Sequence, residues 1–260
     1  MGVPSGVDDS MDGPGADTTV FLDMAFDRFD FERMVAWLQQ RRANDRFAYV
    51  VTPNVDHMVQ IHADPVALRP IYDGADIRLC DSRILAKLAR LRGVTLSVVP
   101  GSDLIAAMFD RVLVAGDRYC LIGGSRDLAE CLRQKFPALD LIHHEPPMGL
   151  RRDAQARAAA IRAAAAAGAR FTLLAVGAPQ QEILAHEMAQ DGGVSGTALC
   201  IGAAIDFIVG AQRRAPRAVQ RAGLEWAWRL AGNPRRLARR YLIEGPKIFM
   251  LAFRWSKPNA

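Results

Sequence analysis

Continuous apolar runs alternate with helix-like stretches along this chain, and this alternation limits the possible folds more than any other feature. The runs read FAYVV, ADIRLC, YCLIGG, LDLIHH, FTLLAVG and TALCIGAA. Strands that alternate with helices predict a parallel sheet with crossover helices. Because the runs do not alternate strictly between polar and apolar residues, both faces of the sheet should be buried. We predict an α/β fold: a Rossmann-like parallel sheet layered by helices in two α/β halves, with a C-terminal basic helical appendage.

Composition divides the chain into three parts. Residues 1–18 are rich in Gly, Pro, Asp and Ser and predict a disordered leader. Residues 19–210 hold the α/β core, and residues 1–210 together carry 21 basic and 26 acidic residues. Residues 211–260 carry 12 Lys and Arg against two Glu, so the net positive charge of the chain belongs to its tail. We expect this tail to be a basic amphipathic appendage that associates with membranes.

Several absences indicate where the protein works. The four cysteines are far apart and lack CxxC spacing, which favours a reducing compartment. The N-terminus lacks the pattern of an export signal. The apolar run Ile248 to Phe253 is far shorter than the roughly 20 residues that span a bilayer. We expect a cytoplasmic protein, peripheral on the inner face of the cytoplasmic membrane.

Polar residues close the first two strands of the core. In open parallel sheets ligands bind beyond the carboxyl ends of the strands. Thr52 and Asn54 follow FAYVV, and Asp81 follows ADIRLC. Each could meet a ligand, and Asp81 could act as a general base. Capping of the following helix explains these residue types as well.

Small residues open the next helices. Gly123 and Gly124 follow YCLI, and their amides could bind an anionic phosphate at a helix N-terminus. Ser102, in VPGSDL, could bind substrate or cap a helix. Glycines are common at strand ends, and the GxGxxG spacing of dinucleotide-binding proteins is absent, which also disfavours a nucleotide-sugar epimerase.

The last two strand ends carry amide and acidic groups. Gly177 and Gln181 follow FTLLAV. The side-chain amide of Gln181 could bind a base or sugar, or it could be solvated. Gly202 and Asp206 follow ALCI, where small residues allow close approach of a ligand. Asp206 could equally pair with a tail arginine.

Other common chemistries are not supported. His143 and His144 are adjacent on a strand, where neighbouring side chains point to opposite faces and chelate poorly. GxSxG and Walker motifs are absent. We expect neither a metal site nor a bound cofactor.

The tail interleaves arginines with Trp, Tyr and Phe. Such a segment can lie on an anionic membrane surface. It could also bind nucleic acid, although no known reader motif accompanies the charge, so we expect no nucleic acid partner. Its arginines could instead bind a diphosphate. The tail helices could also pair with those of a second subunit in a homo-oligomer.

Seven motifs in order resemble one family. They are TPN at 52–54, the strand end at Asp81, PGSDL, LIGG, VGAPQQE, IGAAIDF and RAPRAVQRAGLEWAWRL. Together they are similar to the WecG/TagA/CpsF glycosyltransferases, or glycosyltransferase family 26, over roughly residues 20–250.

The resemblance implies an inverting, metal-independent hexosyltransferase-type enzyme. It would move a sugar from a UDP-sugar donor to a lipid-linked, polyprenyl-diphosphate acceptor in exopolysaccharide or cell-surface polymer synthesis. Asp81 matches the proposed base of the family. The substrate-binding residues it implies, with those we add from the tail, are Thr52, Asn54, Ser102, Gly123, Gly124, Gly177, Gln181, Gly202, Asp206, Arg214, Arg217 and Arg221.

Two positions depart from the family pattern. Family members usually read DG after the base strand, whereas this chain reads Asp81, Ser82, Arg83. Gln180 stands where a basic residue is usual. The first change could alter which sugar fits, and the second could remove a positive charge near the donor.

A non-catalytic nucleotide-sugar or nucleic-acid binding α/β protein is the alternative function.

Overall fold

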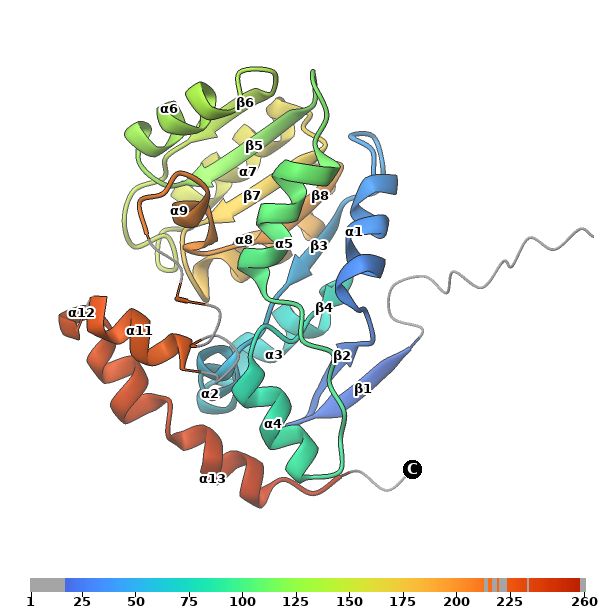
Figure 1. Ribbon diagram of the computed structural model, residues 1–260. Coiled ribbons are helices and arrows are strands. Elements are labelled where there is room, and N and C mark those ends of the chain that lie inside the picture. Colours follow the sequence, from blue (N-terminus) through green and yellow to red (C-terminus); the bar gives the residue numbers. More distant parts are fainter. Residues whose placement is uncertain (1–16, 213–214, 217–218, 220–223, 233, 258–260) are drawn as a thin grey trace, which may run out of the picture.

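Six parallel strands in the order β4-β3-β8-β7-β5-β6 form the central sheet, with helices on both faces (Figure 1). The computed structural model describes residues 17–212, 215–216, 219, 224–232 and 234–257. The α/β prediction is confirmed. Strand β8 joins the two halves of the chain, because it pairs with β3 on one side and β7 on the other.

The strands are short, as expected for buried parallel strands, and an antiparallel hairpin precedes them. The hairpin and sheet strands are β1 (Thr18–Phe21), β2 (Met24–Asp27), β3 (Ala48–Val51), β4 (Ile77–Arg78), β5 (Arg118–Gly123), β6 (Asp140–His144), β7 (Phe171–Ala175) and β8 (Thr197–Cys200).

The helices of the core include one π-helical segment, η1, and the tail contains another, η2. Their bounds are α1 (Phe31–Gln40), α2 (Val55–Ala63), α3 (Pro65–Asp73), α4 (Arg83–Leu91), α5 (Gly101–Ala107), η1 (Met108–Val112), α6 (Arg126–Lys135), α7 (Ala154–Ala167), α8 (Gln180–Asp191), α9 (Ala204–Ile208), α11 (Glu225–Gly232), α12 (Pro234–Ala238), η2 (Arg239–Glu244) and α13 (Lys247–Arg254).

Each face of the sheet has its own buried cluster. Helices α1, α5 and α6 pack on one face, and α2, α3, α7 and α8 pack on the other. Consecutive residues of β5 divide between them: Tyr119 and Leu121 join one cluster, whereas Cys120 and Ile122 join the other. The uninterrupted apolar runs therefore reflect burial on both faces.

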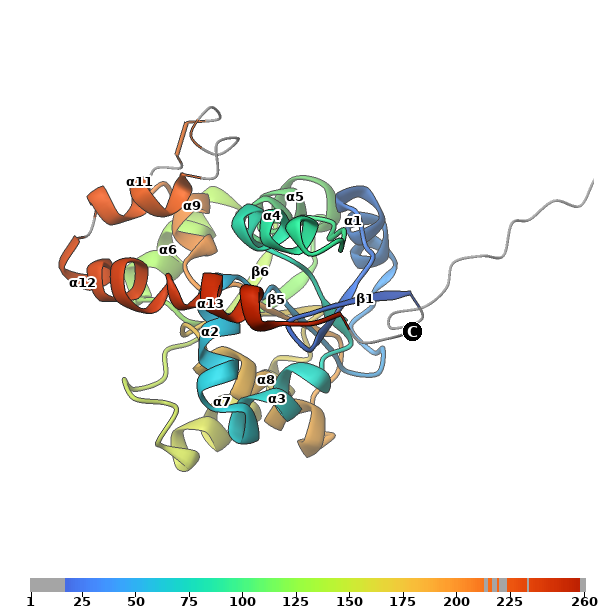
Figure 2. The ribbon, with the colours of Figure 1, turned by 90° about the horizontal axis from the view of Figure 1, so that it is seen from below.

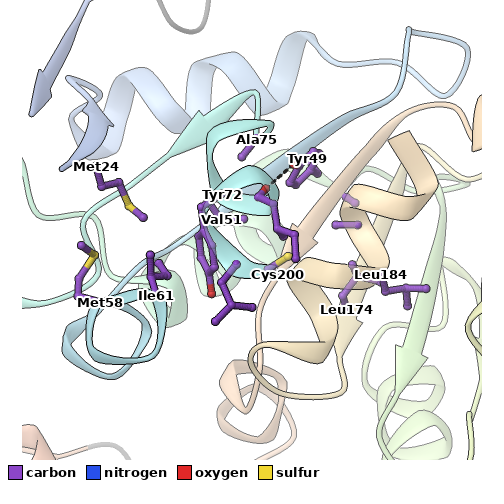
Figure 3. Close-up of a cluster of buried hydrophobic side chains, with 14 of the residues drawn as sticks. Met24, Tyr49, Val51, Met58, Ile61, Tyr72, Ala75, Leu174, Leu184 and Cys200 are labelled. Carbon is purple, nitrogen blue, oxygen red and sulfur yellow. Dashed lines mark hydrogen bonds between the residues drawn. The ribbon is translucent and has the colours of Figure 1, made fainter. Parts of the chain in front are cut away.

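Buried tyrosines fix the helices that carry the site. Tyr49 donates from its hydroxyl to the Ile71 carbonyl at 2.5 Å, at the end of α3. Tyr72 lies among Val51, Met58 and other apolar side chains (Figure 3). Burial raises the pKa of both tyrosines well above its usual value. Both stay neutral, and the pair of helices α2 and α3 is held against the sheet.

The helix-like stretch between β3 and β4 forms two helices, α2 and α3. Asp64 ends α2, and its side chain caps α3, which begins at Pro65. The proline ring has no N–H to donate and disfavours helical backbone in the residue before it, so the break follows from the sequence.

The end of the tail is fixed to the core. Helix α13 runs against α2 and α4 (Figure 2). Ile248, Ala252 and Trp255 are buried in the same cluster as α2. The Trp255 indole donates to Asp23 at 3.1 Å, and Arg92 donates to the Trp255 carbonyl at 2.6 Å. The tail helices thereby lie beyond the carboxyl ends of the strands (Figure 1).

Within the described part of the chain, every helix is too short or too polar to cross a bilayer. The disordered leader predicted for residues 1–18 falls almost wholly on residues 1–16, which lie outside the described residues.

Candidate active site

Asp81 lies just after β4, and both of its carboxylate oxygens are held. Oδ1 accepts from the Gly101 amide at 2.7 Å, at the start of α5. Oδ2 accepts from the Asn54 side-chain amide at 3.4 Å. Ser82, rather than Asp81, caps α4, because its hydroxyl accepts from the Leu85 amide at 3.2 Å. The carboxylate is therefore not used as a cap of the helix that follows it.

Asn54 caps the helix that follows it, one of the two roles considered for it, and its side chain also reaches Asp81. Its side-chain oxygen accepts from the backbone amides of Asp56 and His57 and caps α2. Because the oxygen faces these donors, the amide nitrogen faces Asp81. The cap of α2 thus fixes the direction from which Asn54 approaches the carboxylate.

A cavity of about 360 Å³ opens beside Asp81. Its polar wall includes Asn54, Asp81 and Ser102, and Ser82 and Arg83 also line it. Its opposite wall comes from the tail and is mainly apolar. That wall is formed by Glu225, Trp226, Arg240, Tyr241, Leu242, Gly245, Pro246, Ile248 and Phe249. The cavity can therefore receive a molecule with a polar end and an apolar end.

An ion pair ties the tail to the start of α2. Arg240 lies 3.1 Å from Asp56 through Nη2 and Oδ2, and the same oxygen accepts from Gln60 at 2.7 Å. Both members of the pair also line a second cavity of about 430 Å³, which extends to Ala178. The Asp56–Arg240 pair thus lies between the Asp81 cavity and a second one next to the end of β7.

Thr52 supports the loop that holds Asp81. A methyl group added at Gly101 would lie 3.1 Å from the Thr52 hydroxyl, so the side chain of Thr52 packs directly against this glycine. Ser102 follows in the same loop and reaches the cavity. The four predicted residues Thr52, Asn54, Asp81 and Ser102 are therefore brought together.

Gly123 and Gly124 form a turn at the end of β5 whose shape has a structural cause. At Gly123 φ is +97° and an added Cβ would lie 2.8 Å from the backbone of Ala175, so only glycine fits. His143 Nε2 lies 3.1 Å and 3.3 Å from the two glycine carbonyls. As carbonyls only accept, this nitrogen donates. The His143 ring supports the turn.

Gln181 and Gly202 meet at the ends of β7 and β8. The Gly202 amide donates to Gln181 Oε1 at 2.9 Å, and Gln181 is buried. Gly177 has φ +81° and open space around it. Asp206, on α9, accepts from Gln212 at 2.8 Å. These residues lie on neighbouring strand ends but do not line the Asp81 cavity.

Gln180, the second departure from the family pattern, closes a loop. Its amide donates to the Val176 carbonyl, and its oxygen accepts from the Arg151 amide at 3.1 Å. Arg214, Arg217 and Arg221 lie outside the described residues, so their predicted contact with substrate stays a prediction.

Cys80 is next to Asp81 but is not reactive. Burial raises the pKa of its thiol to about 12, so almost none is thiolate near neutral pH. Among the residues whose positions are described, no three His, Cys, Asp or Glu side chains are grouped as metal ligands.

A family model for the glycosyl transferase WecG/TagA/CpsF family matches residues 19–260. The chain belongs to the WecG/TagA/CpsF glycosyltransferase family. It is therefore a transferase that takes a sugar donor and an acceptor. The predicted membership is confirmed, and the match includes the tail, whose side chains form one wall of the Asp81 cavity.

Sequence reasoning missed several residues of this WecG/TagA/CpsF site. His57 was not singled out, although it bonds the Asn54 backbone. The tail was expected at a membrane surface, and the sequence did not show that its Trp226, Arg240, Tyr241 and Phe249 also line the cavity. Their periodicity shows an amphipathic helix but does not show which part of the core that helix meets.

Proposed function

We propose that this protein transfers a sugar from a UDP-sugar to a polyprenyl-diphosphate-linked sugar, in exopolysaccharide or cell-surface polymer synthesis. The observation that carries the proposal is the Asp81 cavity, which is polar at Asp81 and Asn54 and apolar along the tail. An acceptor that joins a sugar to a lipid has the same division of polarity. Family membership supplies the reaction type.

In the proposed reaction Asp81 is the general base. Its carboxylate takes the proton of the acceptor hydroxyl while that oxygen forms a bond to C1 of the donor sugar. The bond between C1 and the phosphate oxygen breaks, and UDP leaves with the electron pair. A single displacement of this kind inverts the configuration at C1.

The departing diphosphate needs stabilising charge. We assign this role to backbone amides near Gly123 and Gly124 and to tail arginines, with Gly177, Gln181, Gly202 and Asp206 around the nucleotide. Guanidinium groups suit diphosphate oxygens because they bind them in pairs of hydrogen bonds. Arg214, Arg217 and Arg221 are the assigned arginines, and Arg240 already lies beside the cavity. The sequence has no DxD motif, and we propose that no metal is needed.

An assay of UDP release tests this function. The full-length protein, in mild detergent and EDTA, is given a short polyprenyl-diphosphate-linked sugar and a panel of UDP-sugars in turn. We expect release from one donor that depends on the acceptor. Release that needs a divalent cation would contradict metal independence, and no release with any donor would favour a binding protein.

We also propose that the tail rests on the inner face of the cytoplasmic membrane. Ile243, Phe249, Met250 and Phe253 are exposed apolar residues of η2 and α13, and Lys247 and Arg254 add positive charge. Apolar side chains that enter the interface and cations that meet anionic lipid both strengthen such binding.

Replacement of Phe253 by Ser should weaken binding to phosphatidylglycerol vesicles by about tenfold, since one large apolar side chain no longer leaves water. Phe253 is 81% exposed. Co-sedimentation measures the effect. The matched control is Val114→Ser, which removes a 60% exposed apolar side chain before β5. Equal binding of the Phe253 variant and the wild type would place the membrane surface elsewhere.

A further inference from the structure

A row of buried polar side chains runs from the end of β8 toward Asp81. The Gly202 amide donates to Gln181 Oε1 at 2.9 Å, and Gln181 Nε2 donates to Glu182 Oε1 at 2.8 Å. The same Glu182 oxygen lies 3.4 Å from His57 Nε2. This row crosses from the start of α8 to the first turn of α2.

The ring of His57 has a defined orientation. Its Nδ1 accepts from the Asn54 backbone amide at 3.2 Å. A ring nitrogen that accepts carries no proton, so in the neutral ring the proton is on Nε2, which faces Glu182. Glu182 therefore selects the form of the ring that can hold the Asn54 backbone.

Asn54 passes this order on to the carboxylate. Its backbone is held by His57 and its side-chain oxygen by the first amides of α2. Its remaining polar group, the amide nitrogen, donates to Asp81 Oδ2. Three contacts thus separate Glu182 from the proposed base: the close approach of Glu182 to His57 and two hydrogen bonds, from Asn54 to His57 and from Asn54 to Asp81.

Burial of the Glu182 carboxylate at this place lowers the stability of the fold. Its side chain is 1% exposed and that of His57 is 8% exposed. Glu182 Oε2 is buried and has no hydrogen-bond partner among the described residues. Burying a carboxylate without satisfying both oxygens is costly, and an apolar residue would usually fold better there. Strongly buried ionisable groups close to an active site are candidates for a functional role.

We propose that Glu182 and His57 are positioning residues for catalysis. They hold Asn54 so that its amide fixes the Asp81 carboxylate toward the acceptor hydroxyl. The inference rests on the proposed function, because it deepens the role of the same site. Neither residue touches substrate; both act through Asn54 and Asp81.

Kinetics of two variants at one position test the idea. Glu182→Leu removes the carboxylate oxygen that faces His57. It should lower kcat by about 10- to 100-fold with little change in KM for either substrate. Glu182→Gln keeps an oxygen for His57 and Gln181 and should restore kcat to within about threefold of the wild type. A Gln variant as poor as the Leu variant would mean that the charge is required, and would overturn a positioning role.

The decisive measurement is the effect of Glu182→Leu in a protein that already lacks the base, the Asp81→Asn variant. If Glu182 acts through Asp81, Glu182→Leu should cost less than about twofold in the Asp81→Asn protein, because the residues work as one unit. A loss of equal size in both backgrounds would overturn the proposal. The matched control is Glu187→Leu on the same helix, where the glutamate pairs with Arg157, and it should leave kcat unchanged.

A second position and a structural measurement keep the test decisive. If Glu182→Leu does not fold, as judged by circular dichroism, His57→Gln should give the same loss, with His62→Gln on α2 as its control. In heteronuclear NMR spectra the side-chain amide signal of Asn54 should move in Glu182→Leu or His57→Gln and stay in Glu187→Leu. An unmoved signal overturns the positioning role. If the signal moves in these variants but the wild-type protein has no transferase activity, the proposed function is refuted instead.

Discussion

Replacement of Asp81 by Asn should lower the rate of sugar transfer by about 10²- to 10⁴-fold, the usual contribution of a general base. The variant keeps the shape of the side chain, and its oxygen can still accept from the Gly101 amide. Affinity for the UDP-sugar should change little, because the proton moves only in the reaction. Initial rates of UDP release, together with calorimetric titration of the donor, measure the two effects separately.

The matched control for this substitution is Asp110→Asn, which changes an exposed aspartate of η1 outside the cavity lining. It should leave the rate unchanged. A rate for Asp81→Asn within twofold of the wild type would remove Asp81 from the chemistry. It would also favour the alternative function, a protein that binds nucleotide sugars without converting them.

Replacement of Trp255 by Ala should lower the free energy of unfolding by about 3–5 kcal/mol, as for other large buried aromatic residues. Trp255 is 6% exposed, and its ring meets Phe21 edge to face with centroids 5.1 Å apart. The variant also loses the hydrogen bond to Asp23. Urea denaturation followed by circular dichroism measures the change.

Phe253→Ala provides the comparison, since it removes an aromatic ring from the same helix at an exposed site. Its free energy of unfolding should stay within about 0.5 kcal/mol of the wild type. Equal stability of the two variants would show that the end of the tail is not fixed to the core. The tail could then not form a permanent wall of the Asp81 cavity.

Much of the core was predictable because parallel strands leave a plain pattern. Buried runs end where the chain turns, and all six strands point the same way, so Thr52, Asn54 and Asp81 had to meet at one edge. Local pattern was sufficient for these residues. For Gly123 the sequence indicated only a turn that could bind phosphate, and the close approach of the β7 backbone was not predicted.

The features that were missed depend on contacts between distant segments. The β1–β2 hairpin turns at Leu22 and Asp23, both with positive φ, and has neither the Asn-Gly nor the Asp-Gly pair that usually marks such a turn. His57 is one of two histidines on α2, and its meaning depends on Glu182 more than a hundred residues away. The packing of α13 on α2 and α4 likewise depends on tertiary contacts.

The departures Ser82 and Arg83 take on a specific meaning from their positions. Both line the cavity beside Asp81, and Ser82 also caps α4. Side chains are therefore present where the family pattern has glycine after the base. They are the first residues to vary once the donor sugar is known.

The product of the reaction shows whether the sugar is transferred by a single displacement. The lipid-linked acceptor is incubated with its UDP-sugar in EDTA, and the lipid product is examined by mass spectrometry and NMR. We expect an acceptor heavier by one sugar residue, joined with the anomeric configuration opposite to that of the donor. Free sugar and UDP with an unchanged acceptor, or a product that retains the donor configuration, would contradict transfer by a single displacement at Asp81.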